Sequence, residues 1–181
     1  ADNKEIKVQL GNTFIMQSNE RYRAAAFTTF AELIGNVSEH SQSDIVGFAA
    51  LQGYEPSHKS KHIQTVISDS GLGISSTLRP TLEKNHPKLH KKYKENTIDS
   101  DVGLVKESFL KGGISRLGKG RGLGFKSSRE QSAKFDAIFS IRQETFNLEF
   151  IYRSGVLIKT NIEKNLSKIH GTHICFDFNV D

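Results

Sequence analysis

The stretch from Ser68 to Ile74 places a carboxylate, Asp69, just before two closely spaced glycines, Gly71 and Gly73. Thr65-Val66-Ile67 precedes it and predicts a strand that ends at the carboxylate. Glycines let the backbone approach a flat ligand closely. A carboxylate can accept a hydrogen bond from the exocyclic amine of adenine, whereas guanine offers a carbonyl at that position. The pattern therefore predicts a purine pocket that prefers adenine, with an ordinary tight turn as the alternative interpretation.

Glu32 and Asn36 form a second candidate pair, because residues four apart lie one turn from each other on the same side of a helix. Gly35 beside them leaves room for a ligand. A carboxylate can orient and deprotonate an attacking water, and an amide oxygen is a suitable ligand for a magnesium ion that keeps water and phosphate ligands. The pair fits a magnesium-dependent site, although Glu and Asn are also common on exposed helix faces.

A glycine run over residues 118–124 is the third candidate. Glycines directly before a helix, here predicted over 125–134, let successive backbone N–H groups point at a phosphate. The candidate nucleotide-binding residues in this run are Lys119, Gly120, Arg121, Gly122, Leu123 and Gly124. The run is not a P-loop, because Gly120 stands where that motif needs Ser or Thr. It also lacks the strand and acidic partner of a dinucleotide-binding fold.

These residues need a helix and a strand to hold them. A helix is predicted from residue 18 or 19 to about residue 40. Its buried stripe consists of Phe27, Phe30, Ile34 and Val37. Before this helix we expect short strands over 6–10 and 13–15, joined by a hairpin turn at Gly11-Asn12. After it, buried strands are expected over 45–50 and 62–67, and the second of these strands leads to Asp69.

A long charged segment over 75–118 separates these elements from the C-terminal strands. We interpret it as a lid, because an excursion of this length between core elements usually has a function. Its lysines cluster near Pro87, at Lys84, Lys88, Lys91, Lys92 and Lys94. Within it, a short helix is marked by Val102, Val105 and Phe109 and is ended by Gly112-Gly113.

The C-terminal part of the sequence changes to strand patterns. Strands are predicted over 135–141, 146–152 and 156–160, with a turn at Arg153-Ser154-Gly155. A final strand is expected over 171–178, with Ile174, Phe176 and Phe178 on the core face. His173 and Cys175 share its other face, where we predict simple packing and not a catalytic pair.

The composition is that of a globular protein: 181 residues, 36% hydrophobic and 25% charged, with a net charge of +5. This length suits one domain, and the start without Met suggests a domain of a longer protein. The sequence contains no membrane-spanning run and no signal-peptide core, so we expect a cytoplasmic location. Lone Cys175 excludes an intrachain disulfide.

The positive charge is concentrated in residues 74–130, which hold 13 basic and 6 acidic residues. This region is where an anion would bind, with a solvated basic loop as the alternative interpretation. Nucleic acid is disfavoured as that anion, because the basic residues are not interleaved with aromatic side chains that could stack on bases.

The four motifs taken together resemble the motif series of the Bergerat-fold (GHKL) ATPases, the superfamily of DNA gyrase B, heat-shock chaperone, histidine kinase and mismatch-repair ATPases. The series is Glu32-x-x-x-Asn36, Asp69-x-Gly71-x-Gly73, the glycine run over 118–124, and Gly171-Thr172. The resemblance extends over residues 6–180. The sequence of residues 32–41 is similar to the corresponding segment of bacterial regulatory members, the histidine kinases and anti-sigma serine kinases.

The resemblance implies a single histidine kinase-like ATPase domain over residues 1–181. Its fold would be a two-layer α+β sandwich, a mostly antiparallel mixed sheet covered on one face by helices, with an ATP lid at about 75–118. Glu32 would activate water and Asn36 would bind magnesium. Asp69 would read adenine, with Gly73 beneath the base and Thr172 near it.

The expected activity is hydrolysis of Mg-ATP or transfer of its terminal phosphoryl group to a protein, in a regulatory or signalling module. The alternative is a non-hydrolysing switch in which ATP orders the lid and the lid is presented to a protein partner. A phosphoacceptor, if one is used, is expected in a parent chain or on another protein.

Overall fold

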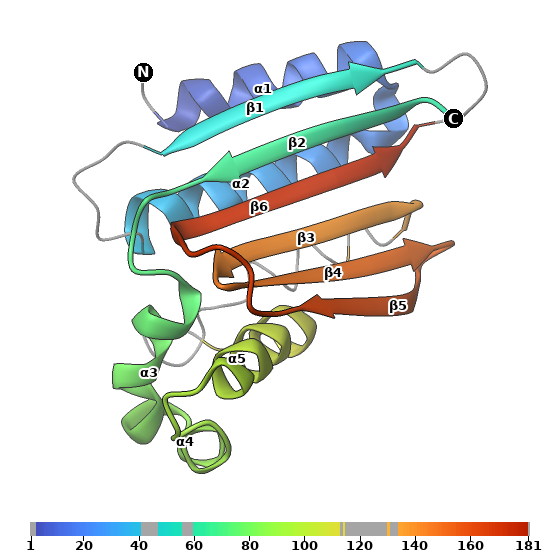
Figure 1. The fold of residues 1–181 in the computed structure, drawn as a ribbon. Coiled ribbons are helices and arrows are strands. Elements are labelled where there is room, and N and C mark those ends of the chain that lie inside the picture. Colours follow the sequence, from blue (N-terminus) through green and yellow to red (C-terminus); the bar gives the residue numbers. More distant parts are fainter. Residues whose placement is uncertain are drawn as a thin grey trace.

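The computed structural model describes residues 3–40, 47–55, 60–112, 114, 130 and 134–180, and only the backbone of residues 3 and 36–40. Its centre is a six-stranded sheet in the order β1-β2-β6-β3-β4-β5 (Figure 1). The strands are β1 (Phe48–Tyr54), β2 (His62–Ser68), β3 (Ala137–Glu144), β4 (Phe146–Arg153), β5 (Val156–Glu163) and β6 (Ile169–Asn179). All five pairings are antiparallel, so the expected mixed sheet is corrected to an antiparallel one.

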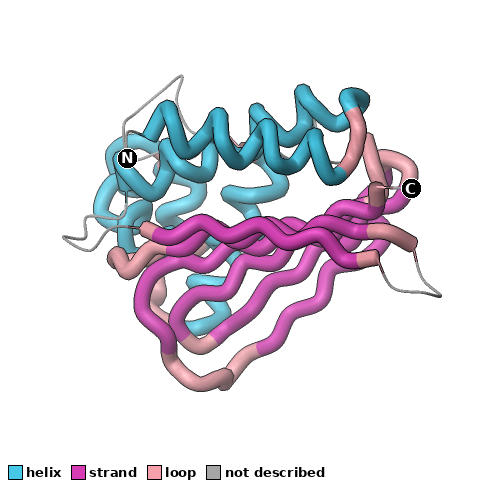
Figure 2. Tube along the Cα trace, turned by 90° about the horizontal axis from the view of Figure 1, so that it is seen from above, coloured by secondary structure: helices cyan, strands magenta, loops and turns pink. Residues whose placement is uncertain are grey.

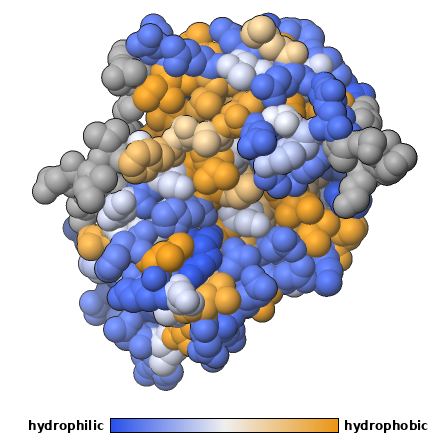
Figure 3. Space-filling view, turned by 45° about the horizontal axis from the view of Figure 1, so that its top comes forward, coloured by the Kyte–Doolittle hydropathy of each residue, from blue (hydrophilic) through white to orange (hydrophobic). Residues whose placement is uncertain are grey.

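Helices pack on one face of this sheet, which confirms the α+β layered architecture expected from the sequence (Figure 2). The helical segments are α1 (Asn3–Gln17), η1 (Glu20–Tyr22), α2 (Arg23–His40), α3 (Ile74–Asn85), α4 (Pro87–Lys92) and α5 (Ile98–Lys111). The other sheet face carries no described helix. Figure 3 shows that face obliquely, with apolar residues gathered near its centre, and Phe48 and Val66 contribute exposed apolar area there.

The predicted N-terminal hairpin is wrong, because residues 6–15 lie in α1. Ile6, Leu10 and Phe14 recur every four residues and contact the hydrophobic core, and Phe14 is fully buried. Gly11 does not form a turn. A Cβ at this position would lie 2.6 Å from Cζ of Phe27, so the glycine allows α1 and α2 to pack closely.

The helix predicted from residue 18 or 19 to about residue 40 is confirmed as η1 and α2. Asn19 caps η1, since its side chain accepts a hydrogen bond from the Arg21 N–H at 3.0 Å. Phe30 and Ile34 are buried as expected, and Phe27 is half-buried. The side chain of Val37, the last member of the predicted stripe, lies outside the described residues.

The predicted strands over 62–67, 135–141, 146–152, 156–160 and 171–178 are all present. Ile174, Phe176 and Phe178 face the core as expected. The strand expected to be buried over 45–50 is instead the exposed edge strand β1, described from Phe48 onward. An edge strand has only one neighbour, so apolar residues such as Phe48 remain accessible to solvent.

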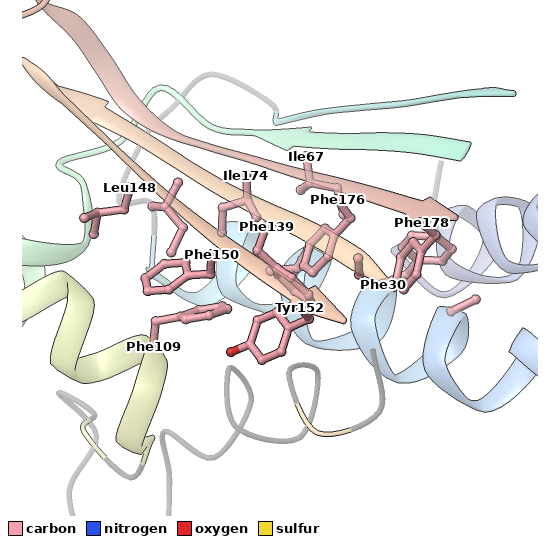
Figure 4. Close-up of a cluster of buried hydrophobic side chains, with 14 of the residues drawn as sticks. Phe30, Ile67, Phe109, Phe139, Leu148, Phe150, Tyr152, Ile174, Phe176 and Phe178 are labelled. Atoms are coloured by element: carbon pink, nitrogen blue, oxygen red, sulfur yellow. The ribbon is translucent and has the colours of Figure 1, made fainter. Parts of the chain in front are cut away.

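Residues 74–111, most of the segment expected to form a lid, fold into α3, α4 and α5. The helix predicted from Val102, Val105 and Phe109 is confirmed as α5. It ends at Gly112, which has a φ of 63° and donates its N–H to the Ser108 carbonyl at 3.0 Å. Phe109 stacks on Phe150, so α5 is part of the core (Figure 4).

Candidate functional site

Asp69 lies directly after β2, where the loop turns toward α3, and its side chain is only 9% exposed. Its Oδ1 atom accepts hydrogen bonds from the Gly71 N–H at 2.8 Å and the Thr172 N–H at 3.3 Å. Its own N–H donates to the Thr172 carbonyl at 2.9 Å. These three contacts fix the carboxylate. Within the described residues, no hydrogen bond engages Oδ2, which is therefore available to accept one from a ligand.

Gly171 explains how β6 approaches Asp69 so closely. This glycine has a φ of +83°, and a Cβ built on it would lie 1.8 Å from the Asp69 carbonyl oxygen. No residue with a side chain fits this space without moving the backbone. The late glycine noted in the sequence therefore sets the distance between the start of β6 and the Asp69 loop.

Thr172 follows Gly171 and is 6% exposed. No described residue forms a hydrogen bond with its Oγ1 atom. Its backbone N–H and carbonyl both contact Asp69, so the two residues present neighbouring polar groups at the same end of the sheet. A hydroxyl can donate or accept and a carboxylate can accept, which suits the mixed donor and acceptor edge of a heterocyclic base.

Gln143, which sequence reasoning missed, holds the far side of the loop. This β3 residue is fully buried; its Oε1 atom accepts the Ile74 N–H at 2.7 Å, and its Nε2 atom donates to the Ser75 Oγ at 2.8 Å. Gly73 has a φ of +79°, and a Cβ there would lie 2.8 Å from Gln143 Cδ. The available signal was a glutamine at an inward position in the alternating β3 pattern, where every other inward residue is apolar.

Glu32 is half-buried on α2, and Asn36 follows one helical turn later. The C-terminal half of α2 lies behind the end of β2 that leads to Asp69 (Figure 1), and the two elements are in contact. Among the described residues, none forms an ion pair or hydrogen bond with the Glu32 side chain. The Asn36 side chain lies outside the description, so its predicted role as a metal ligand stays a prediction.

The structure thus brings Asp69, Gly71, Gly73 and Thr172 together, and it places Glu32 on the helix behind them. The predicted phosphate-binding residues 119–124 lie outside the described residues. So does most of the helix predicted over 125–134. In the described ranges, no group of three or more His, Cys, Asp or Glu side chains could hold a metal ion.

The opposite face of β6 carries His173 and Cys175, as predicted. Burial, together with the nearby Asp177 carboxylate, raises the pKa of the Cys175 thiol. Nε2 of His173 lies 3.0 Å from the His170 carbonyl oxygen, not beside the thiol. A protonated thiol without a base partner is a poor nucleophile, which agrees with the prediction of simple packing.

A scan of protein-family models and a search of curated proteins found no match to this chain. In the described part of the structure, no helix combines the length and apolar character needed to span a membrane.

Proposed function

We propose that this chain binds Mg-ATP and hydrolyses it or transfers its terminal phosphoryl group to a protein, as a regulatory module with a Bergerat-type fold. The observation that supports this proposal best is the Asp69 carboxylate. Protein groups fix its Oδ1 atom, while its Oδ2 atom has no hydrogen-bond partner among the described residues. A buried acceptor in fixed orientation selects a donor, so it favours the amine of adenine over the carbonyl of guanine.

The residues at this site fit the adenine end of the nucleotide. Gly73 lacks a side chain where the loop passes over Gln143, and Asp69 supplies the acceptor. Bound magnesium would offset phosphate charge, with Asn36 as its protein ligand; magnesium commonly takes only one or two protein ligands and fills its shell with water and phosphate. Glu32, without a partner in the described part of the chain, would orient and deprotonate the attacking water.

The first test is calorimetric titration with ATP and GTP, in magnesium, of the native chain and the Asp69→Asn variant. We expect ATP to bind and GTP to fail, and the substitution to weaken ATP binding about tenfold or more, the loss typical of a charged acceptor. Asp177→Asn is the matched control, because Asp177 accepts its hydrogen bonds from His62 and Gln64. Equal binding of ATP and GTP would contradict the proposal.

One observation favours the alternative of a non-hydrolysing switch. The Asp69 loop continues directly into α3, and Gln143 contacts both Ile74 and Ser75 at the first turn of that helix. A ligand that shifts this loop would therefore change the position of α3 without hydrolysis of ATP.

Glu32→Ala separates the two functions. If the protein is an enzyme, the variant should bind ATP with native affinity and lose hydrolysis or phosphotransfer by about a hundredfold or more, because a general base is removed. If the protein is a switch, ATP should still change hydrogen exchange in α3 to the native extent, and the native chain should release no phosphate. Glu5→Ala, at an exposed position of α1, is the control.

A further inference from the structure

A small separate hydrophobic core lies between helices α3, α4 and α5. It consists of Leu78 and Leu82 of α3, Tyr93 directly after α4, and Leu104 of α5, and Leu89 of α4 packs against it. We call the helices α3, α4 and α5 around this core the helical platform. Its outer surface is strongly basic around α4. Lysines on this surface are Lys84, Lys88, Lys91, Lys92 and Lys94, all exposed.

Buried and partly buried polar contacts hold the C-terminal end of α4 in the platform. Glu107 of α5 is 9% exposed and accepts hydrogen bonds from Lys92 Nζ, Lys111 Nζ and the Tyr93 hydroxyl, each at 2.6 Å. Arg79 of α3 reaches across to Asp101 at 2.6 Å and also donates to the Tyr93 carbonyl. The lysines of α4 are thus presented on a fixed surface and not on a flexible loop.

Most of this positive charge is not neutralised within the protein. Among the described residues, no ion pair engages Lys84, Lys88, Lys91 or Lys94, and Lys92 shares Glu107 with Lys111. Lys88, Lys91 and Lys92 project from one side of α4 at spacings of three and four residues, where like charges repel. A six-residue helix has little intrinsic stability to offset this repulsion. The contacts between α4 and the rest of the platform supply the missing stability. The fold therefore keeps a cluster of mutually repelling lysines in place.

We infer that the basic surface of α4 is a docking surface for an acidic segment of a protein partner. Carboxylates repeated along a helix or strand match lysines that are one helical turn apart. The surface suits nucleic acid less well, because its charges are lysines, which lack the bidentate geometry of arginine toward phosphate. Its tyrosine, Tyr93, is 8% exposed and cannot stack on a base. This inference is independent of the proposed nucleotide site.

The test measures binding of two fluorescent probes to the full chain, without nucleotide, by anisotropy. One probe is a peptide of alternating glutamate and serine, and the other is a single-stranded oligonucleotide of equal charge. The variant is Lys88→Glu/Lys91→Glu. The matched control is Lys4→Glu/Lys7→Glu, which makes the same charge change at the same spacing on α1. Thermal unfolding confirms that both variants fold.

We expect the peptide to bind at about 0.05 M salt and to lose about tenfold in affinity at about 0.3 M, where exposed charges are screened. Lys88→Glu/Lys91→Glu should weaken peptide binding about tenfold or more, and the α1 control should weaken it less than about twofold. Equal loss in both variants would show attraction to overall charge and would overturn the inference. Absence of peptide binding, or tighter lysine-dependent binding of the oligonucleotide, would also overturn it.

Discussion

The two carboxylate oxygens of Asp69 differ in their hydrogen bonding. Oδ1 accepts two backbone N–H groups, from Gly71 and Thr172, while Oδ2 has no hydrogen-bond partner among the described residues. A carboxylate held in this way loses little freedom when a ligand binds, which improves both affinity and selectivity. The same residue therefore joins β2 to β6 and supplies the acceptor of the proposed site.

Gln143 positions this loop, and its removal should affect the site as well as stability. Gln143→Leu leaves the Ile74 N–H without its acceptor in a partly buried place, which should lower the free energy of unfolding by about 1–3 kcal/mol. Hydrogen exchange of the Ile74 amide should accelerate and ATP affinity should fall. Gln64→Leu, on the other face of the sheet, is the control that should leave nucleotide affinity unchanged. Native exchange at Ile74 in Gln143→Leu would contradict the assigned role.

A buried carboxylate, Glu107, contributes to the stability of the helical platform. Burial of Glu107 opposes its charge, but hydrogen bonds from Lys111, Lys92 and Tyr93 outweigh burial and lower its pKa from 4.5 to about 2. A carboxylate with a lowered pKa in the folded state stabilises that state only while it is ionised. The contribution is complete above pH 4.5 and is lost as the pH falls toward 2.

Acid should therefore increase local opening of the platform within the folded protein. The native chain should lose about 1–2 kcal/mol of platform stability between pH 4.5 and 2, a value reduced because both lysines are exposed. Hydrogen exchange in α4 and α5 across this range is the measurement. Glu107→Gln should be less stable at neutral pH and should not show this acid-dependent loss. An unchanged pH profile in that variant would assign the acid sensitivity to other groups.

At the scale of the whole molecule, a chain of aromatic contacts along the inner face of the sheet joins α1 to α5. Ring centroids lie 5.2 Å apart for Phe14 and Phe178, 4.1 Å for Phe139 and Phe176, 5.3 Å for Phe109 and Phe139, and 4.3 Å for Phe109 and Phe150. Phe176 and Phe178 stack on neighbouring inward positions of β6. The core is therefore continuous from α1 to α5, as Figure 4 shows for most of these rings.

A continuous core predicts a single cooperative unfolding transition. Phe139 lies at its middle, so Phe139→Ala should lower the free energy of unfolding by about 3–5 kcal/mol and shift the whole transition. Urea unfolding followed by circular dichroism and by tyrosine fluorescence should give coincident curves in both proteins. Separate transitions in the native chain would show that the platform and the sheet unfold independently.

Features controlled by short-range sequence patterns could be predicted before the structure was known. Apolar runs and alternating apolar residues predicted β2, β3, β4 and β6, because strands favour β-branched residues and strand side chains alternate between two faces. The apolar spacing of α2 and the glycine that ends α5 were equally local signals. The candidate residues Asp69 and Gly73 were also identified from one short motif, since the requirement for an acceptor beside flexible backbone is itself local.

Features that depend on distant partners became visible only in the folded protein. Residues 6–15 contain a turn-like Gly11-Asn12 and β-branched residues, yet burial of Phe14 against Phe178 places them in a helix. Asp69 and Thr172 meet although they are 103 residues apart, and Gln143 reaches Ile74 across 69. These contacts arise from strand order and register. The motif therefore predicted which residue could bind a base, and the pairing of β6 with β2 and β3 decided what surrounds it.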